Sequence, residues 1–141
     1  MMLNLSIPIL CNVKIIESYI IDQQYWIDDY NGLFISPCQS ALNFRHRMSK
    51  SGYASDWHVA GDATLILVLS GILRIGLWDN SYRNFAAGDV FIAQDKLHAN
   101  THFNNHTAQV IGDQKLVALH LKLPSVCIGW SYYKSHFLGQ C

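Results

Sequence analysis

Residues 65–93 read LILVLSGILRIGLWDNSYRNFAAGDVFIA, and the spacing of the turn residues in this stretch predicts the architecture. Residues 65–69 are a continuous apolar run that is too short for a typical helix, and Ser70-Gly71 follows it directly. Short apolar runs bounded by turn residues predict buried strands. Asp79-Asn80-Ser81 and Gly88-Asp89 supply turns between the next runs, so the stretch predicts short strands joined by tight turns.

The same pattern continues on both sides of this stretch. Residues 41–48 read ALNFRHRM and alternate strictly, with the apolar side chains and His46 on one face, which predicts a half-buried strand. Residues 108–111 and 116–123 predict two further strands. Residues 19–30 leave open a short helix or two strands. Because no long amphipathic helix is apparent, we predict an all-β sandwich or barrel.

The chain has 141 residues, which fits one domain. We divide it into three parts. Residues 1–40 are expected to form strands or a short helix that packs on a barrel made by residues 41–123. Residues 124–141 carry an aromatic tail that is expected to pack on the barrel or on a partner chain, because so apolar a terminus is unfavourable in water.

Ten Lys and Arg balance ten Asp and Glu, and only 14% of the residues are charged. A neutral chain lacks the positive charge that grips a phosphate backbone, so nucleic-acid binding is excluded. Low charge favours self-association, which predicts a homodimer. The longest apolar run, residues 65–69, is too short to cross a bilayer, so no membrane association is expected.

The N-terminal residues 1–11 contain no Lys or Arg before their apolar stretch, and Leu10 is not the small residue of a signal cleavage site. We therefore predict a cytoplasmic protein. The four cysteines are widely spaced and include no CxxC pair. Free thiols are expected for all four, and a cysteine-based metal site is not.

Several glycines and histidines resemble the motifs of the cupin superfamily. The first motif reads Gly, five residues, His-x-His, three or four residues, Glu, six residues, Gly. In this sequence Gly52 is followed by five residues and His58, and Thr64 is followed by six residues and Gly71, which is similar to that order. Gly88 and the histidines ten and fourteen positions later are similar to the second motif. The resemblance implies a single-domain cupin double-stranded β-helix, a small jelly-roll barrel that holds a small-molecule ligand in its mouth.

The resemblance also implies one divalent transition metal (zinc, iron, nickel or manganese), held by two histidines and a glutamate from the first motif and a histidine from the second. In this sequence Ala60 stands at the second histidine and Thr64 at the glutamate. The implied ligands that remain are His58 and one of His98 and His102. On one straight strand the last two would lie about 13 Å apart, so at most one of them is a ligand.

Asp56 lies two residues before His58, so both side chains share a face if the segment is extended. The pair is the candidate catalytic group, with His58 as base and Asp56 as its orienting carboxylate. The alternatives are a hydrogen-bonded structural histidine and a solvent-exposed aspartate. His46 and His120 are interpreted as structural, and His106 and His136 carry no signal. The predicted pocket is lined by Trp57, His58, Thr64, Phe91, His98 and His102.

We interpret the chain as a cupin-like protein that binds a small molecule in the barrel pocket, with a degenerate or absent metal site. Two alternatives stay open. One is a metal-dependent oxygenase or isomerase, in which Asp56 or Asp62 supplies the missing carboxylate. The other is a metal-free acid–base enzyme that modifies sugars and uses His58 as its base. The sequence leaves open whether the protein is an enzyme, because sites rather than folds carry chemistry.

Overall fold

The computed structural model describes residues 6–12, 17–24, 27–36, 38, 40–96 and 105–124. Within these ranges every helix or strand is a β-strand. The strands are β1 (Ser6–Asn12), β2 (Ser18–Gln24), β3 (Asp28–Tyr30), β4 (Leu33–Ile35), β5 (Asn43–Ser49), β6 (Thr64–Ser70), β7 (Ile72–Leu77), β8 (Tyr82–Phe85), β9 (Val90–Ala93), β10 (His106–Ile111) and β11 (Leu116–Lys122). No helix in the described part of the chain has the length and apolarity that a membrane span requires.

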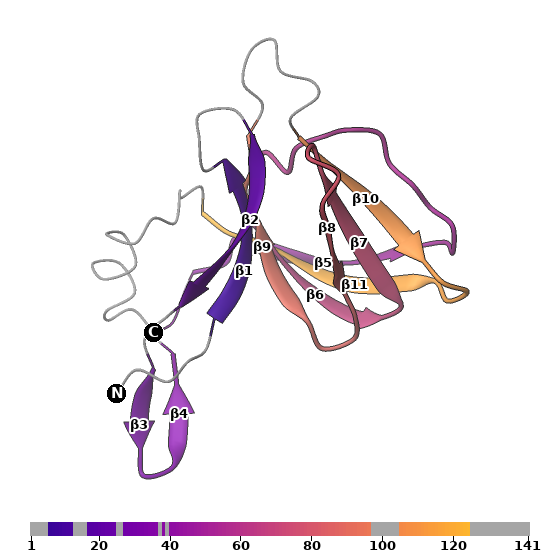
Figure 1. The fold of residues 1–141 in the computed structure, drawn as a ribbon. Helices are drawn as coiled ribbons and strands as arrows, with labels where there is room; N and C mark the ends of the chain where they lie inside the picture. The colour runs from indigo at the N-terminus through magenta and orange to yellow at the C-terminus, as the bar shows by residue number, and fades with distance from the viewer. Residues whose placement is uncertain are drawn as a thin grey trace.

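Two sheets face each other, and a separate β3–β4 hairpin stands apart from them (Figure 1). The larger sheet has the strand order β2-β1-β9-β6-β11-β5, and the smaller has the order β10-β7-β8. Every neighbouring pair is antiparallel except β1 and β9. Isolated bridges, Ala54 with Gln109 and His58 with His106, lay the segment before β6 along the free side of β10. The predicted all-β jelly roll is confirmed.

The predicted barrel needs one correction, because the hydrogen-bonded order of the described strands does not close into a ring. The architecture is an open sandwich of two sheets. The first 40 residues, whose structure the sequence left open, contribute strands in their described part, and β1 lies inside the larger sheet beside β9. The tail at residues 125–141 lies outside the described residues, so its packing stays a prediction.

The main core lies between the sheets. Alternate residues of the facing strands point inward and meet there, as the period of two requires. Phe85 and Phe91 stack with their ring centroids 4.1 Å apart. The buried members of this core are Leu10, Ile66, Val68, Leu73, Ile75, Leu77, Phe85, Phe91, Ala93, Val110, Leu116 and Ala118. A second, smaller cluster on the other face of the larger sheet contains Ile9, Cys11, Ala63, Ile92 and Leu123.

The two faces of the edge strand β5 are oriented opposite to the simplest expectation, which is that the apolar face points into the core. Its apolar face is exposed, with exposed fractions of 68% for Phe44 and 66% for Met48. Its polar face, which carries Arg45 and Arg47, points to the concave side of the sandwich. The prediction of a strand is confirmed, but the prediction that it is half-buried is wrong, because nothing in the described part of the chain covers the face that carries Phe44 and Met48.

The β6–β7 connection depends on a glycine. Gly71 has a φ of +81°, and a Cβ atom at this position would lie 2.5 Å from the carbonyl oxygen of Lys115. Both features favour glycine, since other residues are strained at positive φ and would clash with the backbone.

The expectation of four free thiols is wrong for Cys38, which is disulfide-bonded. Cys11 is a buried thiol on β1, outside any disulfide. The spacing of cysteines in the sequence does not predict which of them form disulfides, since disulfide pairing depends on distances in the fold.

Candidate functional site

A cavity of about 100 Å³ opens between the two sheets. Apolar core residues form most of its wall. Its polar side chains come from both sheets and from the segment beside β10, and they are Arg47, Ser49, Tyr53, His58, His106 and His120. A mostly apolar cavity with a few convergent polar groups is the usual character of a small-molecule site.

A fully buried carboxylate lies behind the cavity residue His106, and it belongs to Asp95, just after β9, which is 0% exposed. Its Oδ2 accepts a hydrogen bond of 2.6 Å from Nδ1 of His106 and one of 2.8 Å from Oγ of Ser18. Its Oδ1 accepts a hydrogen bond of 2.9 Å from the backbone N–H of Ala60. Three donors therefore compensate the buried charge. With Nδ1 held by the carboxylate, Nε2 is the nitrogen of His106 that a ligand can use.

His58 lies beside His106 through backbone pairing. Each of the two residues donates its N–H to the carbonyl oxygen of the other, at 2.9 and 3.1 Å. Their ring centroids are 4.4 Å apart. Nδ1 of His58 lies 2.8 Å from the carbonyl oxygen of Asp56 and 3.2 Å from Oγ of Ser55. Because a carbonyl oxygen can only accept, Nδ1 carries the proton, and Nε2 is again the nitrogen left for a ligand.

A groove of about 200 Å³ continues from the cavity along the inner face of β5, β6 and β11. It shares Arg47 and His120 with the cavity. Its lining consists of Asn43, Arg45, Arg47, Thr64, His120 and Lys122. Among the residues that the structure describes, this lining contains no carboxylate.

The charges of this groove are unevenly compensated. Lys122 forms an ion pair of 2.6 Å with Asp62, and its hydrogen bond lowers the pKa of that carboxyl. In the described part of the chain, Arg45 and Arg47 have no acidic partner. Burial lowers the pKa of His120 to about 4, with further contributions from the charges of Arg47 and Arg45.

The residues predicted from the sequence lie in different environments. Asp56 and Trp57 are exposed, and Asp56 meets His58 through its backbone carbonyl rather than its carboxylate. Thr64 lines the groove, and its Oγ1 donates a hydrogen bond of 3.1 Å to the carbonyl oxygen of Asp62. His58 and Phe91 line the cavity. His98 and His102 lie outside the described residues. The proposed roles of these residues stay predictions.

Sequence reasoning missed His106, Asp95, Arg47 and His120. Counting from Gly88 led to earlier histidines, because the length of the loop between the strands cannot be known from the motif alone. One signal was present, since His106 stands just before a predicted strand and Asp95 just after another. Two polar residues at facing strand ends are a reason to expect a pair.

The described residues do not fit the metal that the motifs imply. Ala60 and Thr64 replace two of the implied ligands, and the three donors around Asp95 already occupy its carboxylate. No three His, Cys, Asp or Glu side chains of the described ranges gather as a ligand set. His58 and His106 alone fall short of the three protein ligands that catalytic zinc sites use.

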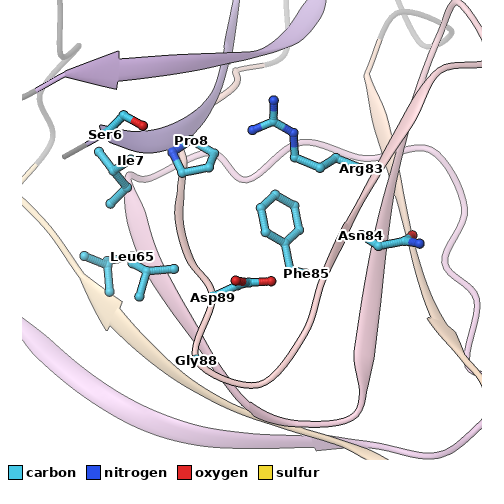
Figure 2. Close-up of a pocket in the computed structure, with 10 residues that line it drawn as sticks. Ser6, Ile7, Pro8, Leu65, Arg83, Asn84, Phe85, Gly88 and Asp89 are labelled. Atoms are coloured by element: carbon cyan, nitrogen blue, oxygen red, sulfur yellow. The ribbon is translucent and has the colours of Figure 1, made fainter. Parts of the chain in front are cut away.

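A larger depression of about 500 Å³ lies beside the β8–β9 turn and the start of β1. Figure 2 shows Arg83 close to Phe85 there, with Asn84 directed away from both. The charged groups of this depression already have partners. Arg83 donates hydrogen bonds of 2.7 and 3.1 Å to Asp22, and Asp89 accepts one of 2.8 Å from the N–H of Ala86. The depression is therefore a weaker candidate than the inner cavity.

No protein-family model matches the sequence, and no curated protein matches it either. Several solved structures are similar in fold. An uncharacterised conserved protein with a double-stranded β-helix domain from Klebsiella pneumoniae is 18% identical, with 70% of this chain and 84% of that chain covered and a TM-score of 0.45. A cupin-2 domain-containing protein from Shewanella frigidimarina is 15% identical, with 72% and 84% covered and a TM-score of 0.43. A polyketide cyclase from Streptomyces resistomycificus is 15% identical, with 64% of each chain covered and a TM-score of 0.44.

The winding of the chain itself identifies the fold. After β6 the chain crosses to the smaller sheet for β7 and β8, and returns to the larger sheet for β9. It crosses again for β10 and returns for β11. Such alternation between two facing sheets is the winding of a jelly roll. The described strands therefore have the double-stranded β-helix winding of an all-β jelly roll, the fold that the sequence predicts.

Proposed function

We propose that the protein binds a small molecule in the cavity between its two sheets, in contact with His58 and His106. The observation that carries this proposal is the buried pair of Asp95 and His106 at the cavity wall. A buried, hydrogen-bonded polar pair is costly to desolvate, and apolar residues of similar volume often stabilise a fold at least as well. Its position beside a cavity therefore supports a role in binding.

The chemistry of the two imidazoles supports a ligand with polar hydrogens. In their neutral forms His58 and His106 each present Nε2 as an acceptor, since Nδ1 is engaged by Asp56 and Asp95. A hydroxyl or amide N–H of a ligand is the matching donor. The apolar wall, formed by Ile75, Phe91 and other core residues, would contact the rest of the molecule.

Acid–base catalysis is a second candidate, and the carboxylate behind His106 favours it. Nε2 of His106 would take a proton from a C–H or O–H group of the bound molecule and later return it. Asp95 would hold the ring in orientation and stabilise the imidazolium that forms. Such a cycle consumes no oxidant or reductant, because the proton leaves and returns.

A ligand screen tests the binding proposal. Neutral and charged metabolites would be added to the isotope-labelled protein while the imidazole NMR signals are followed. A true ligand should shift the signals of His58 and His106, and His106→Gln should weaken its binding by about tenfold or more. His46→Gln is the matched control, since His46 lies on the exposed face of β5.

His58→Gln is the second variant, because it leaves the buried Asp95 pair intact. Equal affinity of the wild type and of both cavity variants would contradict the proposal. A ligand whose hydrogens exchange with deuterated solvent in the wild type, but not in His106→Gln, would support the catalytic candidate.

We also propose a homodimer that forms over the exposed apolar face of β5. Phe44 and Met48 on β5 expose 68% and 66% of their surface, Leu42 just before the strand exposes 61%, and β5 is the edge of its sheet. An exposed apolar edge strand is a surface that a second copy can cover. Light scattering after size exclusion should give the mass of a dimer, and Phe44→Ser should give a monomer. A monomeric wild type would contradict this proposal.

The cytoplasmic location stays a prediction of the sequence. The disulfide at Cys38 counts against it, since structural disulfides are rare in the reducing cytosol.

A further inference from the structure

The two arginines of β5 lie on the same face of the strand and border the groove. Arg45 and Arg47 are two positions apart, about 6.6 Å along the strand. Arg45 pairs in register with His120 on β11, and Arg47 pairs with Ala118. The two guanidinium groups and the half-buried imidazole of His120 therefore line one short stretch of the concave surface.

This stretch carries positive charge that the described residues leave uncompensated. The groove receives Arg45 and Arg47 from β5, His120 and Lys122 from β11, and only the neutral Thr64 from β6. Asp62 already pairs with Lys122. Two like charges on one strand face repel each other. Burial is the main cause of the low pKa of His120, and the charges of Arg47 and Arg45 lower it further.

Exposed arginines are usually solvated, but Arg45 and Arg47 differ from an ordinary surface pair because the groove that they border is continuous with the cavity. Arg47 and His120 line both spaces, which measure about 200 and 100 Å³. One small molecule can therefore reach the arginines with one end and the two cavity histidines with the other.

We propose that the ligand of this protein is a small organic anion whose carboxylate or phosphate group is bound by Arg45 and Arg47, with its uncharged part in the cavity beside His58 and His106. This inference rests on the function proposed above and names the class of its ligand. The planar guanidinium fork matches an oxyanion with two parallel hydrogen bonds, which a lysine cannot offer. A bound anion also relieves the repulsion between the two arginines.

The test uses inorganic phosphate and acetate as probes of the full-length protein, with sodium chloride as the control at equal ionic strength. The imidazole NMR signal of His120 reports binding in the groove, because His120 lines it. Phosphate or acetate should shift this signal with a saturable dependence that chloride does not reproduce. The stronger of the two probes tells whether the site prefers phosphate or carboxylate.

Substitutions locate the anion. Arg45→Gln and Arg47→Gln should each weaken the saturable shift by about tenfold or more. Arg74→Gln is the matched control, because Arg74 lies on β7, away from the groove, where it stacks on Tyr82 and donates to Asn84. An absent response of His120 to both probes, or an equal response in the arginine variants, would overturn the inference.

The two proposals fail separately. Neutral compounds that shift His58 and His106, while neither anion moves His120, would leave the cavity proposal standing and overturn the anionic ligand. Conversely, anions that shift His120 without any compound reaching the cavity histidines would overturn the cavity proposal. Organic acids that shift all three histidines, and lose affinity in Arg47→Gln, would support both.

Discussion

Nδ1 of His106 donates a hydrogen bond of 2.6 Å to Oδ2 of Asp95, and the exposed fractions of these residues are 4% and 0%. Asp95 stands two residues after β9 and His106 begins β10, so the pair joins the two sheets beside the cavity. The same carboxylate also accepts hydrogen bonds from the hydroxyl of Ser18 on β2 and from the backbone N–H of Ala60. One buried charge therefore anchors the segment that carries His58.

Removal of this charge should destabilise the protein strongly. Asp95→Ala leaves three donors without their acceptor, two of them buried, and we expect a loss of about 3–5 kcal/mol in the free energy of unfolding, measured by urea denaturation. Asp22→Ala is the matched control, because it breaks an exposed pair with Arg83 and should cost less than about 1 kcal/mol. Similar losses in the two variants would contradict the structural importance of Asp95.

The low pKa of His120 in the folded chain should make the protein less stable in mild acid. Its pKa is about 4 in the folded chain, against an ordinary value of 6.5 in the unfolded chain. Between these two values the unfolded state binds more protons, so stability rises with pH across this window. The contribution is fully present above about pH 6.5 and is lost as the pH falls toward 4.

Thermal melts at pH 7 and pH 4.5 measure this effect. The drop in Tm should be smaller in His120→Gln than in the wild type, because the variant has no proton to bind there. Other titrating groups are common to both proteins and cancel in the comparison. Identical drops would show that His120 is not the group responsible.

The turn between β6 and β7 should tolerate no side chain. Gly71→Ala combines a positive φ with a Cβ clash against the carbonyl oxygen of Lys115. Gly112→Ala has nearly the same φ, +80°, but open space around the new Cβ. The control should therefore lose only the backbone preference, about 1–2 kcal/mol, and Gly71→Ala clearly more. Equal losses by urea denaturation would mean that the turn rearranges freely.

Two residues that the sequence assigns to the pocket wall should behave very differently. Phe91 is 1% exposed and stacks on Phe85, so Phe91→Ala should cost about 3–5 kcal/mol in urea denaturation. Trp57 is 42% exposed, and Trp57→Ala should cost less than half as much. A large loss at Trp57 would indicate that it is covered in solution.

The strand positions could be predicted because they depend on local pattern. Turn residues and apolar runs lie within a few positions of one another, and β6, β7, β8 and β9 begin and end close to the predicted positions. The site could not be predicted in the same way. The pairing of His58 with His106 depends on register across a loop of unknown length, and the inward face of β5 depends on which neighbours cover it.

The parallel pairing of Ile9 with Ile92 has a consequence for biosynthesis. β1 leaves the ribosome before its partner β9, because the strands from β2 to β8 are translated between them. Until β9 is translated, Ile9 and Leu10, which are buried in the folded protein, lack their partner strand on that side. Nascent chains of this protein should therefore engage chaperones until β9 emerges and gives β1 its place in the sheet.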